Sequence, residues 1–213
     1  MKKLFCFFFL VFVLEASGQT SFSFRYFGMT IHPFGDQTAS IQPYKLDKQA
    51  RFVLNFGGFA SVDHYVYKDL ICVTGMQGFF TDCSGGWGGF THIGVRALVF
   101  EKKKHRFMLG LGPLLYYRED WNRFDEYEDK GFFNRYHSRN IGDVQWKIFP
   151  IGGEFAWHWK VSEEFDVNAG FTPGAPLAMS FSAGITWWPK RLGPQTSEVK
   201  VVIPKKRKKK AKE

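Results

Sequence analysis

The sequence predicts an all-β chain, an eight-stranded antiparallel up-and-down outer-membrane β-barrel. Three observations lead to this prediction: the chain begins like an exported protein, its later segments alternate apolar and polar residues, and the connections between those segments alternate between short and long. A soluble eight-stranded barrel or sandwich is the alternative. The high aromatic content, 19% of the residues, and the export signal favour the membrane barrel.

The first element is a signal peptide, predicted at residues 1–18. Lys2 and Lys3 precede a short apolar run, and small residues occupy positions −3 and −1 of a cut after Gly18. The run is shorter than the roughly 20 apolar residues that a membrane-spanning helix needs. Cleavage leaves two cysteines, Cys72 and Cys83. In an exported chain these either form one disulfide or remain two free thiols, and the sequence leaves both open.

Residues 19–188 form the predicted barrel domain, with strands that alternate between a lipid face and an inward face. In the fourth strand, Ile93 belongs to the apolar face, whereas Gly94 and Arg96 belong to the inward face. In the last strand, Phe181 faces lipid and Ser182 faces inward. The eight predicted strands cover residues 21–32, 50–61, 66–80, 87–100, 105–118, 144–160, 164–172 and 177–188.

The connections between these strands predict which end of the barrel faces the periplasm. Short turns are expected near 62–65, 102–104 and 162–163. The other connections are longer or richer in glycine and proline, at 33–49, 81–86, 119–143 and 173–176. Short periplasmic turns and longer external loops are typical of outer-membrane barrels, so both ends of the barrel domain should be periplasmic. Eight strands enclose an interior that side chains nearly fill, or that holds one small ligand.

Residues 189–213 form a basic tail that we predict to be disordered and periplasmic. From Lys190 onward the chain carries 10 basic and 2 acidic residues, including the unbroken run Lys205–Lys210. Without the tail and the signal peptide, 17 residues of each sign remain, so the barrel domain is neutral. A neutral domain argues against nucleic-acid binding. For the tail we expect contacts with anionic periplasmic polymers or anionic lipid, and for the protein as a whole a monomer.

A candidate site lies at the predicted outer rim. His32 ends the first strand, and Asp82 and Cys83 follow the third, so the topology brings them to the same end of the barrel. An imidazole, a carboxylate and a thiol are the groups that nucleophilic catalysis at an acyl carbon requires. His92 and His158, like Arg96, are better interpreted as an internal polar network. No spacing typical of metal ligands occurs, and no cofactor is expected.

Four stretches resemble the outer-membrane lipid A palmitoyltransferase (PagP) family. They are "MTIHPF" (29–34), "GFFTDCSGGW" (78–87), "FMLGLGPLLYYREDWN" (107–122) and "FTPGAP" (171–176). The resemblance covers most of residues 25–188, through short motifs. The chain departs from the family in lacking its amphipathic N-terminal helix and in carrying the basic tail, which indicates a distant relative.

The resemblance implies an outer-membrane acyltransferase of a Gram-negative bacterium. Such an enzyme moves a fatty acyl chain from a membrane phospholipid donor to lipid A or another lipid acceptor. The family's essential histidine corresponds to His32, and its Asp-Ser pair corresponds to Asp82 and Cys83. We expect His32 to act as base or proton shuttle, Asp82 to orient it, and Cys83 to act as nucleophile or hydrogen-bond donor. The resemblance further implies Gly94 as the floor of the acyl pocket. It also implies lateral lipid access where Pro150 and Pro173 interrupt the sheet.

Two other functions remain open from the sequence. His137 and Ser138, together with an inward Glu154, suggest a lipid A deacylase or esterase. The third possibility is a structural barrel or adhesin without catalysis. In that case His32, Asp82 and Cys83 are ordinary polar residues of the rim.

Overall fold

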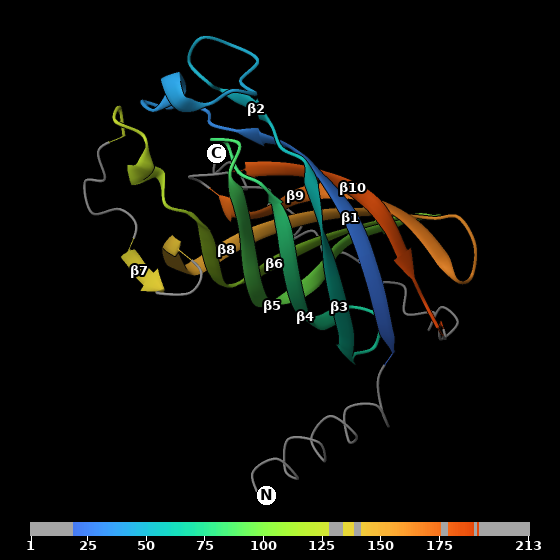
Figure 1. Ribbon diagram of the computed structural model, residues 1–213. Helices are drawn as coiled ribbons and strands as arrows, with labels where there is room; N and C mark the ends of the chain where they lie inside the picture. The colour runs from blue at the N-terminus through green and yellow to red at the C-terminus, as the bar shows by residue number, and fades with distance from the viewer. Residues whose placement is uncertain (1–18, 128–133, 139–141, 176–178, 190, 192–213) are drawn as a thin grey trace, which may run out of the picture.

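The chain folds into a closed antiparallel β-barrel of eight strands, as predicted (Figure 1). The computed structural model describes residues 19–127, 134–138, 142–175, 179–189 and 191, so the predicted signal peptide and most of the predicted tail lie outside it. Each barrel strand pairs with its neighbours, and β10 pairs with β1 to close the sheet. The barrel strands are β1 Thr20–Ile31, β3 Gly57–Tyr67, β4 Ile71–Thr81, β5 Trp87–Lys102, β6 His105–Glu119, β8 Gly142–Lys160, β9 Phe165–Ala175 and β10 Met179–Trp187.

Short additional elements extend the barrel at its loop end. The strand β2 (Phe52–Leu54) pairs with β1, and β7 (Asn134–Ser138) pairs with β8. Two 3₁₀-helices also lie at this end. The helix η1 (Ala39–Ile41) lies in the loop between β1 and β2, and η2 (Trp121–Arg123) lies in the loop between β6 and β7. Figure 1 shows β2 beside the loop end of β1, with η1 beyond it. Among the described residues, no helix is long and apolar enough to cross a membrane.

The sequence misplaced the second strand and the turn after it. The predicted strand 50–61 is divided into β2 and β3, and the expected turn at 62–65 is wrong because β3 continues to Tyr67. The segment expected to turn contains Asp63, a charged residue in the middle of β3. Its side chain points into the barrel, where Arg96 neutralises it, so a charged residue can occupy the middle of a strand.

The outward face of the barrel is apolar, as the alternation predicted. Ile93 and Leu111 are each 61% exposed, and Phe181 and Ile185 are exposed on β10. Large apolar side chains exposed around the whole sheet would be unfavourable in water, whereas lipid tails solvate them. The inward residues of β10, such as Ser182, are buried. The molecule is therefore an outer-membrane-type barrel.

Two apolar clusters occupy the barrel interior, separated by a polar layer. The outer cluster, nearer the loops, contains Phe27, Phe59, Met76, Phe80, Phe90 and Leu114. The inner cluster, nearer the turns, contains Tyr65, Cys72, Met108 and Trp188. Cys72 is a free thiol in the inner cluster, and Cys83 is free at the opposite end of the barrel, so the two do not form a disulfide.

An ion cluster of four side chains occupies the middle layer. Arg96 Nη1 lies 2.6 Å from Asp63 Oδ2, and Arg96 Nε donates to Glu154 Oε2 at 2.7 Å. A second bond joins Arg96 Nη2 to the other oxygen of Glu154, which gives a bidentate pair. Arg25 Nη1 approaches Glu154 at 3.5 Å. The four charges cancel, and they link β1, β3, β5 and β8 across the interior.

This arrangement confirms that Arg96 belongs to an internal polar network. His158 is buried as well, and its Nδ1 lies 3.4 Å from the hydroxyl oxygen of Thr186. His92 is buried four residues before Arg96 on the same strand, β5. Glu154, the acid of the deacylase hypothesis, is paired with Arg96 in this network. The interior is thus a neutral polar layer between two apolar ones.

We expect Arg96→Met to destabilise the barrel by about 3–5 kcal/mol, because removing one partner leaves buried carboxylates with too little positive charge. Equilibrium unfolding by urea in lipid vesicles measures this loss. Arg51→Met, which changes an exposed arginine, should alter the free energy of unfolding by less than about 0.5 kcal/mol. Equal effects of the two substitutions would show that the cluster is not a stabilising feature.

Candidate functional site

The structure brings His32 and Cys83 into contact at the outer rim. His32 directly follows β1, and Cys83 lies in the loop between β4 and β5. The His32 Nε2 atom lies 3.9 Å from Cys83 Sγ, within the range of a hydrogen bond to sulfur. The two residues are 51 positions apart in the sequence, and the barrel topology alone places them together.

The other ring nitrogen of His32 is held by the backbone of Ala50. His32 Nδ1 lies 3.0 Å from the Ala50 carbonyl oxygen. A carbonyl can only accept a hydrogen bond, so Nδ1 is the nitrogen that carries the proton in neutral imidazole. The lone pair of Nε2 is therefore available toward the thiol. This is the tautomer that a general base next to a nucleophile needs.

Ala50 presents its carbonyl from an unusual backbone conformation. Its φ is +49°, in the left-handed region that residues with a side chain rarely adopt, and it is fully buried. The two chain segments around it are tied together, since His32 N–H donates to Arg51 O and Asp36 N–H donates to Gln49 O, both at 2.8 Å. These bonds hold the strained conformation in place.

Asp36 is the carboxylate next to His32, and sequence reasoning missed it. Its Oδ2 lies 3.6 Å from His32 Nδ1. Burial alone would raise the pKa of Asp36. However, hydrogen bonds from Thr38, the charge of His32 and a bond from Gln42 together lower it below its usual value. Asp36 therefore remains ionised, and it can stabilise an imidazolium formed at His32.

Asp82, the acid predicted to orient His32, forms its hydrogen bonds with other residues. Its Oδ1 accepts hydrogen bonds from the Ser84 N–H at 2.9 Å, from the Ser84 hydroxyl at 2.8 Å and from the Gly86 N–H at 3.0 Å. Its Oδ2 accepts from the indole N–H of Trp121. The carboxylate closes the turn of its own loop and anchors η2, so the structure pairs His32 with Asp36 instead.

The thiol of Cys83 lies in an apolar cluster beneath the loops. Cys83 is only 8% exposed and packs with Ile41, Ala50, Val53 and Trp121. Burial, followed by the negative charge of Asp82, raises the pKa of Cys83 to about 12. The sulfur is therefore a neutral thiol near pH 7, and it becomes nucleophilic only when a base removes its proton.

Gly94 is inward-facing, as predicted, but its surroundings are polar and crowded. A side chain added there would place its Cβ 2.6 Å from His92 Nε2 and 2.7 Å from the Leu111 carbonyl oxygen. The next inward residue along β5 is Arg96, at the centre of the ion cluster. An acyl chain that reached Gly94 would thus meet charged groups.

Both predicted access prolines coincide with irregular strand pairing. The β6–β8 register shifts between Gly112 and Leu114, opposite Pro150. The β8–β9 register shifts between Gly153 and Phe155, opposite Pro173. The side chain of Pro173 lies outside the described side chains, so only the backbone irregularity is established there.

The residues of the deacylase hypothesis are not brought together. His137 on β7 pairs with Asp143 at the outer end of β8. Glu154 lies eleven residues further along the same strand, which corresponds to about 35 Å at ~3.3 Å per residue. The side chains of His137 and Ser138 lie outside those the structure describes. In the described part of the chain, no three histidine, cysteine or acidic side chains group as metal ligands would.

The fold is similar to solved barrels, at low sequence identity. The N-terminal β-barrel domain of Pseudomonas aeruginosa OprF matches with a TM-score of 0.45 and 12% identity, over 80% of this chain and 98% of that one. Ail, the attachment invasion locus protein of Yersinia pestis, matches with a TM-score of 0.43 and 11% identity, over 80% and 96%. Its complex with the heparin analogue sucrose octasulfate matches with a TM-score of 0.42 and 12% identity, over 80% and 97%. No protein-family model matches the chain, and no curated protein matches it.

We expect the alkylation rate of Cys83 to keep rising beyond pH 10 in the folded barrel, because the reactive thiolate forms only as the pH approaches a pKa of about 12. Iodoacetamide labelling, followed by mass spectrometry of the Cys83 peptide, measures this rate. In the urea-unfolded chain the rate should level off above the ordinary thiol pKa of about 8.5. A folded protein that levels off at the same pH would contradict the buried, neutral thiol.

Proposed function

We propose that the protein is a small, non-conducting outer-membrane barrel of a Gram-negative bacterium with a structural role. The observation that carries this proposal is the filled interior. Two apolar clusters and the ion cluster of Arg25, Asp63, Arg96 and Glu154 block the axis of the barrel. A narrow barrel with these layers offers ions no continuous aqueous path.

The rest of the barrel suits such a role. Its lipid face is apolar, and the charges of its interior are neutralised by ion pairs between strands. Its longest loops lie at one end. Surface presentation by these loops is compatible with the structure, because a rigid barrel holds them at one end.

When cells are fractionated, the protein should be recovered with the outer membranes. The purified mature protein should migrate faster on gels when it is not heated, because the closed barrel resists unfolding by the detergent. In planar bilayers it should produce no conductance steps. A porin refolded in the same preparation serves as the positive control. Recovery in the soluble periplasmic fraction, or regular conductance steps, would contradict this proposal.

A second candidate function is acyl transfer at Cys83, which a specific observation favours. The Cys83–His32 contact has the tautomer and the neighbouring carboxylate of a thiol nucleophile with its base. The resemblance of the rim motifs to the PagP family supports the same chemistry. The polar surroundings of Gly94 weigh against it, because they offer no apolar floor for an acyl chain.

The reaction would proceed in two balanced steps. His32 Nε2 takes the thiol proton while Cys83 Sγ attacks the ester carbonyl of a phospholipid. The lysophospholipid leaves with that proton, and a thioester remains. A hydroxyl of lipid A or another acceptor then gives its proton to His32 and attacks the thioester, which restores the thiol. Asp36 stabilises the imidazolium in both steps. In the same proposal, Pro150 and Pro173 mark where the lipid would enter.

His32→Gln and Cys83→Ala should each reduce acyl transfer by at least about 10²-fold, because the base and the nucleophile are lost. Asp36→Asn should reduce it less, and Cys83→Ser should retain part of it. Mass spectrometry of total lipids from cells with and without the protein gives the measurement. Cys72→Ala is the matched control, since it removes the thiol of the inner cluster. Lipids that do not differ between cells with and without the protein would leave the structural barrel as the function.

A further inference from the structure

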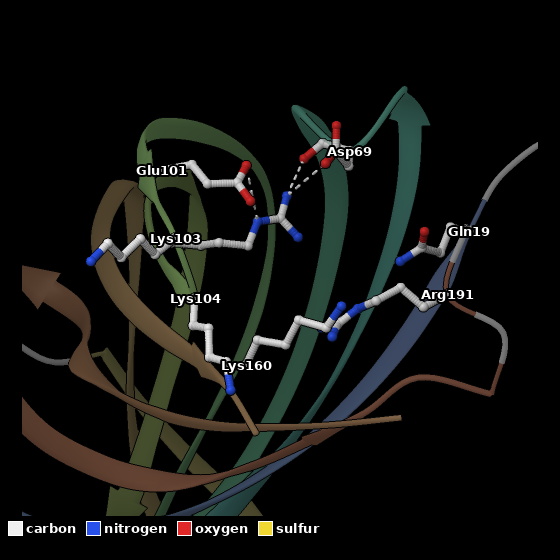
Figure 2. A pocket seen from close by; sticks show the side chains of 8 residues that line it. Gln19, Asp69, Glu101, Lys103, Lys104, Lys160 and Arg191 are labelled. Atoms are coloured by element: carbon white, nitrogen blue, oxygen red, sulfur yellow. Dashed lines mark hydrogen bonds and ion pairs between the residues drawn. The ribbon is translucent and has the colours of Figure 1, made fainter. Parts of the chain in front are cut away.

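A basic cavity lies at the turn end of the barrel, opposite the His32–Cys83 site. It has a volume of about 150 Å³ and lies between residues of all three turns and both ends of the barrel domain. Figure 2 shows that Lys103 and Lys104 come from one hairpin, Lys160 from the next, and Arg191 from the segment after β10. The closed barrel therefore gathers these cations from distant parts of the sequence.

The positive charge in this cavity is only partly neutralised. Its lining contains five cationic side chains and two carboxylates, Asp69 and Glu101. Arg191 pairs with Asp166 at 2.6 Å, and Lys160 pairs with Glu163 at 2.7 Å. Arg106 pairs with Asp69 at 3.5 Å and approaches Glu101 at 3.9 Å. Within the described residues, neither lysine of the β5–β6 turn forms an ion pair. The lining thus carries an excess of positive charge where it opens to solvent.

The backbone holds these cations close to one another. Lys103 and Lys104 form the tight turn between β5 and β6, with Lys103 at a φ of +55°. The Lys160 N–H donates to the Lys104 carbonyl at 2.8 Å, which joins the β8–β9 hairpin to that turn. Both hairpins therefore contribute lysines to the lining of one cavity, where their positive charge would stabilise an anion.

A buried guanidinium adds a directional donor. Arg106 is 8% exposed and donates through Nη2 to the Asp69 carbonyl oxygen at 2.5 Å. Its Nε is buried and has no hydrogen-bond partner among the described residues, although Glu101 lies 3.9 Å away. An unused donor on a nine-tenths buried arginine is costly unless a ligand or solvent accepts from it.

We propose that this cavity binds a phosphate group, carried by a lipid headgroup or free in solution. An arginine donor beside lysine ammonium groups matches the several acceptor oxygens of phosphate. The volume exceeds the ~30 Å³ share of one water several-fold, which leaves room for a phosphate and its first substituent. A lipid phosphate would lie at this height, because Phe100 and Trp159 expose apolar rings on the adjoining strand ends.

The experiment uses the full mature chain, refolded in a maltoside detergent that contains no phosphate. Native mass spectrometry counts the lipids that each barrel retains from an equimolar mixture of phosphatidylglycerol and diacylglycerol, which has the same acyl chains and no phosphate. We expect one retained phosphatidylglycerol. The double variant Lys103→Gln/Lys104→Gln should lower its apparent affinity about tenfold or more. Both lysines are exposed, so the variant should fold, and its heat-dependent gel migration verifies this.

The matched control is Lys68→Gln/Lys102→Gln, which removes two exposed positive charges from the same end without changing the cavity lining. It should retain lipid like the wild type. Arg106→Lys keeps the charge but loses the Nε donor, and it should weaken retention about tenfold or more, as expected for loss of one charge-assisted hydrogen bond. All variants keep the basic tail, so tail binding contributes equally to each.

Competition by inorganic phosphate separates the two sources of the group. Displacement of the lipid by millimolar phosphate shows that the cavity recognises phosphate from either source, whereas persistence of the lipid assigns the cavity to headgroups. Equal retention of the two lipids, or equal loss in the two double variants, would overturn the proposal. None of these outcomes depends on whether Cys83 is catalytic.

Discussion

The buried guanidinium of Arg96 is the constraint on which the barrel interior depends. An eight-stranded barrel is too narrow to hydrate a charge in its middle, so each charge there needs a partner from another strand. Asp63 and Glu154 provide those partners at hydrogen-bonding distance, and Arg25 completes a neutral set. Apolar side chains can then fill the space above and below, which leaves chemistry and binding to the two ends.

The two ends of the barrel differ in how their polar and charged side chains are paired. At the loop end, the hydrogen bonds of Asp82 and the strained backbone at Ala50 hold a neutral thiol against an oriented imidazole. His32, Asp36 and Asp82 each have protein partners there, so the site is held in place and mostly enclosed. At the turn end, five cations line a cavity, and within the described residues Lys103 and Lys104 form no ion pair. The first arrangement suits a proton transfer between fixed atoms, and the second suits an anion that arrives from outside.

Several features of the site could be predicted and others could not. The rim contact of His32 with Cys83 followed from strand order, because successive strands return to the same end. Asp82 hydrogen-bonds to its own loop and to Trp121, and the carboxylate beside His32 is Asp36. Asp36 was missed because its approach to His32 depends on how the first loop folds back along Gln49 and Ala50. Short-range patterns do not encode that path.

The sequence by itself determined the eight strands, their apolar outer faces, the alternation of turns and loops, and the inward phase of Gly94 and Arg96. These follow from a two-residue period, which is a local property of each strand. Only the tertiary structure decided which charges pair, that β3 continues through Asp63, and that Asp36 is the carboxylate beside His32. It also decided that cations from two hairpins and from the segment after β10 line one cavity. Each of these depends on side chains far apart in sequence, and closure of the barrel by β10 on β1 is what brings them within a few ångströms.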